Sequence, residues 1–220
     1  MRAALASLIL VAGLAGAAQA QVAAPSPPAA DPAPAASAVS PPAATAAAPA
    51  APAEPPPTLP TSGDGAQVIR ALEKVCMPAV RGKGIDAAAK AAGLKMNRRD
   101  STWTMPLGGA RDYVIIFQPQ YSQTNVCQAE VRYAVGQDHP IVSAINIWAF
   151  LQEPKLVLGA NYVAVDADGI KRVRKSWESA AAAGGSTRAV NFSVQRKPDD
   201  TPLNPKFDTG MLFYQERTGG

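Results

Sequence analysis

The sequence predicts an α+β fold: an antiparallel sheet of about six to seven strands with three helices packed on it, one disulfide and a disordered N-terminal tail. Three observations lead to this prediction. Residues 63–220 have the length of one domain. Helix-period segments precede groups of strand-period segments and do not alternate with single strands, which argues against a parallel sheet. The two cysteines, Cys76 and Cys127, both fall on core-facing positions.

Residues 1–20 have the pattern of a secretory signal peptide. Arg2 supplies the positive charge, residues 3–17 are apolar, and Ala18-Gln19-Ala20 matches an A-x-A cleavage site. We expect cleavage between Ala20 and Gln21, because the apolar stretch is short for a membrane span of about 20 residues. The alternative is an uncleaved signal that anchors the chain in the inner membrane. No later segment is apolar for long enough to span a bilayer, so the mature chain is expected to lack a transmembrane segment.

Residues 21–62 form a tail rich in proline and alanine. They contain 13 of the 21 prolines of the chain, and their only charges are Asp31 and Glu54. Proline removes backbone donors and alanine offers little surface to bury, so this composition predicts a disordered segment. With cleavage it is a free extension, and without cleavage it is a spacer between a membrane and the domain. A docking segment for a partner is the third alternative.

The folded part, residues 63–220, is mildly basic. Without Arg2, Asp31 and Glu54, the chain holds 20 lysines and arginines and 15 aspartates and glutamates, a net charge of +5. This charge is well below the signature of a nucleic-acid-binding domain. Export argues against a nucleic-acid partner more strongly than charge does.

The two cysteines are expected to form a structural disulfide. Cys76 shares a helix face with Val68 and Leu72, and Cys127 shares a strand face with Val131. An exported chain meets an oxidising compartment, where two cysteines allow one intramolecular pairing. The bond would close a loop of about 50 residues, worth ~4 kcal/mol in the chain-entropy model. A redox pair would need a closer spacing, and a metal site would need more ligands.

The first half of the domain is expected to hold two helices and three strands. Asp64 fits the N-cap of a helix over 63–77, which Pro78 ends, and Gly93 ends a second helix over 85–92. The hydrophobic period then changes to two, and the strands are expected at 102–106, 113–118 and 126–135. Residues 113–117 are apolar on both faces, so this strand is expected to lie centrally and to be covered on both sides.

The second half is expected to hold one helix and four strands. Pro140 fits the first turn of a helix over 138–152, and Pro154 stops it. Asp168-Gly169 turns the first two strands into a hairpin. The strands are expected at 156–166, 170–177, 188–196 and 211–217. The element order suggests a duplicated αβββ unit.

No catalytic motif is recognisable, so no catalytic residue, cofactor or metal site is predicted. The single histidine, His139, stands at the start of a helix, and no serine lies in a G-x-S-x-G or S-x-x-K motif. Residues 81–84 lack the spacing of a phosphate-binding loop, and residues 166–177 lack the ligands of an EF-hand. A glycosidase pair needs only proximity in space, so it remains open among six carboxylates: Asp112, Glu130, Asp138, Glu153, Asp166 and Asp168.

Four cations stand within five residues of one predicted strand. They are Lys171, Arg172, Arg174 and Lys175. One interpretation is that these residues form a strand end or a sheet edge, where charges discourage aggregation between strands. The other is a docking patch for an anionic partner such as lipopolysaccharide, phospholipid headgroups or an acidic protein face. The cations of residues 95–99 would extend the patch if they fold nearby.

The layout resembles that of small exported proteins of Gram-negative bacteria, with a signal peptide, an Ala/Pro stretch and one α+β domain holding two cysteines. The resemblance supplies no active site. We therefore expect a periplasmic protein, or one that is secreted or associated with the outer membrane. Its expected role is non-enzymatic binding of an envelope protein or an anionic envelope component. The alternatives are a small envelope hydrolase with a carboxylate pair, and a membrane-tethered domain on a Pro/Ala spacer.

Overall fold

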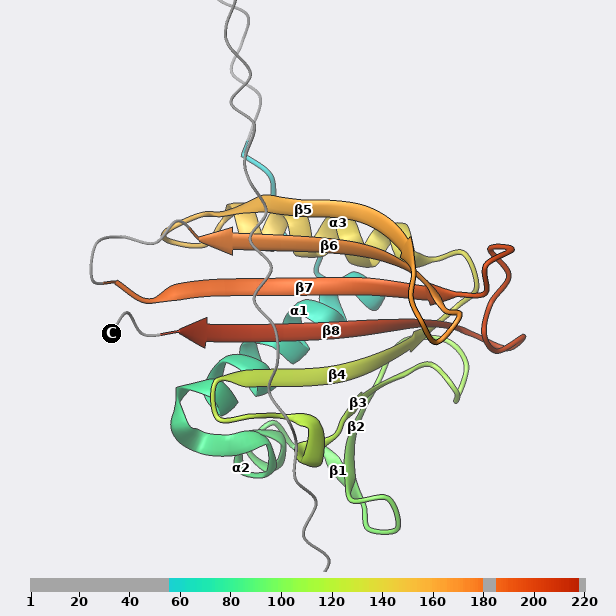
Figure 1. Cartoon of the computed structure of the whole chain (residues 1–220). Coiled ribbons are helices and arrows are strands. Elements are labelled where there is room, and N and C mark those ends of the chain that lie inside the picture. Colours follow the sequence, from blue (N-terminus) through green and yellow to red (C-terminus); the bar gives the residue numbers. More distant parts are fainter. Residues whose placement is uncertain (1–55, 180–184, 218–220) are drawn as a thin grey trace, which may run out of the picture. The chain divides into compact units, whose positions relative to one another are not determined.

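Eight antiparallel strands form a single sheet, and helices cover one of its faces (Figure 1). The computed structural model describes residues 56–179 and 185–217. Across the sheet the order is β1-β2-β3-β4-β8-β7-β6-β5, with every neighbouring pair antiparallel. The strands are β1 (Lys95–Asn97), β2 (Thr102–Pro106), β3 (Val114–Phe117), β4 (Val126–Tyr133), β5 (Leu156–Val165), β6 (Lys171–Ser179), β7 (Thr187–Arg196) and β8 (Asp208–Arg217). The predicted α+β fold with an antiparallel sheet is confirmed.

The predicted number of strands, six to seven, is wrong because the sequence pattern did not reveal β1. This strand has three residues, and all three are exposed. A strand of that length without a buried side chain carries no apolar alternation in the sequence. With β1 included, each half of the domain is a helical region followed by four strands. The two halves meet where β4 pairs with β8.

Two helical regions stand where three separate helices were predicted. The first runs from α1 (Gly63–Ala71) through η1 (Leu72–Cys76) and η2 (Ala79–Lys83) to α2 (Gly84–Ala91), and the second is α3 (Asp138–Phe150). Pro78 does not end the first region, because wider i→i+5 turns flank it, with the N–H of Met77 donating to the carbonyl of Leu72. The bend falls later, at Gly82, whose φ is 104°.

The core lies between the helices and one face of the sheet. Buried side chains of the helical regions pack on alternate residues of the strands. The largest buried residues are Trp148, Trp177, Tyr133, Tyr214, Phe117, Phe192, Leu72, Ile115, Ile141, Ile145 and Leu212. In β3 the alternate residues Val114 and Ile116 are only half-buried. The prediction that this strand is covered on both sides is therefore wrong, since the helices cover one face.

Polar contacts attach α3 to the sheet. The indole N–H of Trp177 donates to Asn146 over 2.9 Å. At the start of the helix, Arg196 donates to Asp138 over 3.1 Å and to the fully buried Asp208 over 3.2 Å. A buried carboxylate is costly without such a partner, so this arginine holds β7, β8 and α3 in one arrangement.

The predicted disulfide between Cys76 and Cys127 is present and joins residues 51 positions apart. It connects η1 to β4, so it attaches the first helical region to the central strand that pairs with the other half. Both cysteines are fully buried.

The predicted signal peptide, its cleavage point at Ala20–Gln21 and the predicted disordered tail up to residue 55 lie outside the described residues. Residues 56–62 lead into α1, and Leu59 packs against the core. Among the described residues, no helix has the length and apolar character that crossing a membrane requires.

Removing the disulfide should destabilise the domain without changing its fold. We expect the double variant Cys76→Ala/Cys127→Ala to lose ~4 kcal/mol of unfolding free energy, because the unfolded chain regains the freedom of a loop of about 50 residues. Urea unfolding followed by circular dichroism measures the loss. Reducing the wild-type protein is the control and should give a similar loss, whereas an unchanged midpoint in both would contradict the assigned role.

Gly210 of β8 should not tolerate a side chain. A Cβ built there would lie 2.5 Å from Cζ of Phe192, whereas a Cβ at Gly159 of β5 would meet nothing closer than 3.7 Å. We expect Gly210→Ala to lower the unfolding free energy by about 1–3 kcal/mol through overpacking. Gly159→Ala is the matched control and should stay within about 0.5 kcal/mol of wild type. Equal effects of the two variants would contradict this packing.

Candidate functional site

The sheet face that the helices leave uncovered presents one continuous row of side chains. The register places Tyr162 of β5 beside Arg174 of β6, then Ser193 of β7, Met211 of β8 and Glu130 of β4. Because successive residues of a strand point to opposite faces, this row lies opposite the core (Figure 1). A ligand approaching the sheet from that side meets these residues.

A hollow of about 390 Å³ lies on this face over β5 to β8. We call it the β5–β8 hollow. Its lining combines hydroxyl, amide and charged groups with aromatic rings. The lining residues are Ala160, Tyr162, Arg174, Lys175, Ser176, Glu178, Asn191, Phe192, Ser193 and Phe213. A few polar groups among apolar ones are typical of ligand sites.

Ser193 is a residue of this hollow whose hydroxyl lacks a hydrogen-bond partner in the described part of the chain. Its side chain is 7% exposed, and its Oγ has no hydrogen-bond partner among the described residues. A buried hydroxyl without a partner costs about 1–3 kcal/mol. The neighbouring Ser176 differs, because its Oγ donates to Glu178 over 2.7 Å. Ser193 can both donate and accept a hydrogen bond, and it lines the hollow.

An exposed aromatic ring forms part of the rim. Tyr162 is 51% exposed, and the guanidinium carbon of Arg174 lies 5.7 Å from the centroid of its ring. This is a cation–π distance, so the two side chains support each other. The open part of the ring faces solvent beside the hollow and offers a flat apolar surface.

The predicted cationic strand is largely neutralised by its own hairpin. Arg172 contacts Asp166 and Asp168, each at 2.6 Å, and Arg174 contacts Asp166. Hydrogen bonds from Arg174, and then Arg172, lower the pKa of Asp166, and those from Arg172 lower the pKa of Asp168 to about 2. Asp168-Gly169 forms the predicted hairpin turn, with Gly169 donating to Asp166.

The two lysines of the strand have separate partners. Lys171 pairs with Asp200 at 2.7 Å, and Lys175 donates to the amide oxygen of Asn161 over 2.8 Å. The strand β6 is second from the edge, so the interpretation of these charges as an edge strand is wrong. Residues 95–99 belong to β1 and the turn after it, at the opposite side of the sheet, and do not extend the patch.

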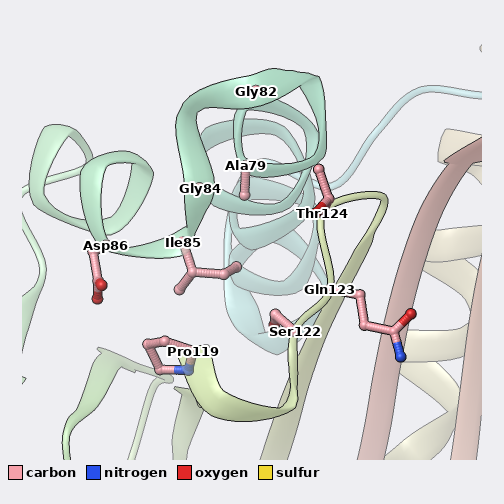
Figure 2. A pocket seen from close by; sticks show the side chains of 9 residues that line it. All are labelled: Ala79, Gly82, Gly84, Ile85, Asp86, Pro119, Ser122, Gln123 and Thr124. Atoms are coloured by element: carbon pink, nitrogen blue, oxygen red, sulfur yellow. The ribbon is translucent and has the colours of Figure 1, made fainter.

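Figure 2 shows a second hollow, of about 320 Å³, between the η2–α2 turn and the loop after β3. Ile85 and Pro119 line it from the two segments. Its polar groups already serve the fold: Asp86 accepts from the indole N–H of Trp103 over 2.7 Å, and Ser122 accepts from the backbone N–H of Gln128. No nucleophile–base pair is present among its lining residues, so we interpret it as a structural groove.

A third hollow, of about 400 Å³, contains two carboxylates. Asp100 and Asp112 line it at the β1–β4 side of the sheet, together with Arg111 and Arg132. Both aspartates are exposed, and Asp100 accepts from the amide of Asn97 over 2.7 Å. A general acid of a glycosidase needs apolar surroundings, which an exposed carboxylate lacks.

The other predicted carboxylates are dispersed. Glu130 pairs with Arg132, and Asp138 pairs with Arg196. His139 is exposed in the first turn of α3. Among the described residues, no group of three or more His, Cys, Asp or Glu side chains is arranged to hold a metal ion.

Sequence reasoning missed Ser193 and Tyr162. The signal was present in part, because Asn191, Ser193 and Gln195 alternate with the apolar Val190, Phe192 and Val194 along β7. That alternation marks an uncovered face. The sequence does not show which strands lie beside β7, so the β5–β8 hollow could not be predicted from it.

Comparisons of the chain with family models, curated proteins and solved structures find no match. The function is therefore argued from the geometry of the site.

The ion pairs of the β5–β6 hairpin should make the unfolding free energy depend on pH in the acidic range. The folded-state pKa of Asp168 lies below its ordinary value, so its contribution is present above about pH 4 and is lost as the pH falls toward 2. We expect Asp168→Asn to be less stable than wild type at pH 6 and the difference to shrink by pH 2. Urea midpoints at the two pH values measure it, and a difference that does not change with pH would contradict the pairing.

Proposed function

We propose that this protein is exported to the cell envelope, in the periplasm, and binds another envelope component without transforming it. The signal-like start of the chain supports export. The buried disulfide suits an oxidising compartment, where such bonds persist. The mixture of hydroxyl, amide and aromatic groups in the β5–β8 hollow supports binding.

The β5–β8 hollow is the proposed binding site, and the buried hydroxyl of Ser193 is the observation that carries the proposal. In the free protein this hydroxyl bears the cost of desolvation without a hydrogen bond. The Oγ has almost no accessible surface, so the surrounding side chains must move apart before a ligand atom restores the bond, and this gain is available only in the complex. Protein groups that fold at a cost and are satisfied on binding are characteristic of sites.

The proposed ligand is the glycan part of an envelope polymer. Ser193 and Asn191 offer hydroxyl and amide groups to sugar hydroxyls, and Tyr162 offers an exposed ring to the C–H groups of a sugar. The internal pairing of Arg172 and Arg174 leaves little free positive charge, which favours a hydroxyl-rich ligand over a densely anionic one. The predicted contact of residues 171–175 with an anionic component remains a prediction.

An envelope hydrolase is the second candidate, because Asp100 and Asp112 line one hollow together. Such an enzyme would cleave the glycan that the binding protein only holds. Release of soluble fragments during a binding assay would favour this candidate. The third candidate, a tethered domain, requires an uncleaved start, which the intact mass of the native protein decides.

Ser193→Ala should separate binding from stability. We expect it to weaken binding by about fivefold or more, because the complex loses one hydrogen bond, while the unfolding free energy stays equal or rises. Ser179→Ala is the matched control: Ser179 is equally buried, but its Oγ accepts from the N–H of Arg188 over 2.9 Å. It should lose about 1 kcal/mol of stability and keep its binding.

Sedimentation with insoluble peptidoglycan and calorimetric titration with lipopolysaccharide-derived oligosaccharide distinguish the two sources of glycan. The protein used is the chain from Gln21 onward with its disulfide formed. Wild-type affinity retained by Ser193→Ala for both sources, or lost by Ser179→Ala, would overturn the assignment of the hollow.

A further inference from the structure

The strand β5 is an edge strand whose only protection is a bulge between Leu158 and Ala160. It lies at one end of the sheet, and no described strand pairs with its outer side. Its ten residues include no charged side chain and no proline. The opposite edge, β1, is only three residues long and is followed by Arg98 and Arg99. Natural sheets protect edges by shortness, charge or proline, so the two edges of this sheet differ in kind.

Exposed apolar side chains gather on this one strand. Ten large apolar side chains are exposed among the described residues, and five of them belong to β5. They are Val157, Leu158, Tyr162, Val163 and Val165, each at least half exposed. Two more, Phe150 and Leu151, lie at the end of α3 just before the strand. The register places these side chains on both faces of β5, so the strand is apolar on either side, and clustered exposed apolar residues mark an interaction surface.

We infer that β5 pairs antiparallel with β5 of a second copy of this chain, about a twofold axis. Such pairing joins two eight-stranded sheets into one and satisfies the outer backbone groups of both strands. The strand suits its own copy because it carries no charge, so a twofold axis brings no like charges together. The arginines of β6, the strand next to β5, already form ion pairs with Asp166 and Asp168, so they add little repulsion between the two copies.

The available area agrees with a stable pair. Seven apolar side chains at about half exposure present on the order of 600 Å² per copy, close to the ~800 Å² per partner of a standard interface. The chain's own N-terminal stretch is a poorer partner for the ladder, although Pro57 lines a hollow together with Phe150, Val157 and Leu158 at the start of β5. It is rich in proline, which cannot donate to a ladder, and residues 21–62 hold 13 prolines.

Pairing would also enlarge the β5–β8 hollow. Ala160 and Tyr162 belong to β5 and line that hollow, so the two hollows of a dimer would meet across the junction. A polymer that occupies both hollows at once would bind with higher apparent affinity, although each hollow makes the same contacts as before. This consequence rests on the proposed function, whereas the dimer does not.

Sedimentation velocity over a concentration range tests the dimer. We expect the wild-type chain from Gln21 onward to change from monomer to dimer between about 1 and 100 μM. The variant Val157→Lys/Val163→Lys should raise the dimer Kd by about tenfold or more, because lysines at an edge oppose pairing. Val135→Lys is the matched control, since Val135 is 47% exposed and follows β4, which three strands separate from β5.

A disulfide cross-link between two copies tests whether β5 lies at the dimer interface. The only two cysteines are joined to each other, so a cysteine placed at Asn161, near the middle of β5, is the sole free thiol. Oxidised Asn161→Cys should form a covalent dimer, while Lys95→Cys on β1 should not. A wild-type monomer at every concentration, a dimer unaffected by the β5 lysines, or a monomer that pairs only with another protein's strand would each overturn the proposal. Loss of glycan binding with the dimer intact would overturn only the proposed function.

Discussion

The pairing of β4 with β8 is the interaction on which the rest of the structure depends. It joins the last strand of one half to the last strand of the other through eight pairs of residues, from Val126–Gln215 to Tyr133–Asp208. Because each half ends at the centre, each half begins at an edge, and β1 and β5 become the two outer strands. The disulfide secures this arrangement, since Cys127 lies in β4 and Cys76 in the helical region that covers it. The position of β5 at the edge is a consequence of this one pairing.

Buried polar atoms without a hydrogen-bond partner among the described residues occur on both faces of the sheet: the hydroxyl of Tyr133, Nε of Arg196 and Oδ1 of Asp208 on the helix side, and Oγ of Ser193 on the uncovered face. On the helix side, the indoles of Trp148 and Trp177 donate to Glu73 and Asn146, and Asp208 accepts from Arg196 and from the backbone of Gly136. Each of these contacts provides a partner within the fold: Trp148–Glu73 joins α3 to η1, Trp177–Asn146 joins β6 to α3, and Asp208–Arg196 joins β8 to β7. Ser193 lies on the other face and lacks one among the described residues. Ser193 differs from the other three because it lines a hollow on the uncovered face, where a ligand can supply the missing hydrogen bond.

Much of the fold followed from local pattern, and the site did not. The disulfide was predictable because Cys76 and Cys127 each sat on an apolar face of clear period, and seven of the eight strands had enough alternation to be found. Pro78 misled the prediction because wide turns carried the helix past it. The docking interpretation of the cations in β6 did not include their partners, because Asp166, Asp168 and Asp200 reach Lys171, Arg172 and Arg174 only in the folded hairpin and loop. The hollow required the order of β5 to β8, which no local pattern contains.

The central claim is that a polar ligand occupies the uncovered face over β5 to β8. Chemical-shift mapping by nuclear magnetic resonance, with soluble glycan fragments titrated into isotope-labelled protein, tests it most directly. The account predicts shifts that saturate and that cluster at Tyr162, Asn191, Ser193 and Phe213, which line this hollow. Shifts that cluster at the groove around Gly82 and Ile85, or no shifts at high glycan concentration, would contradict it.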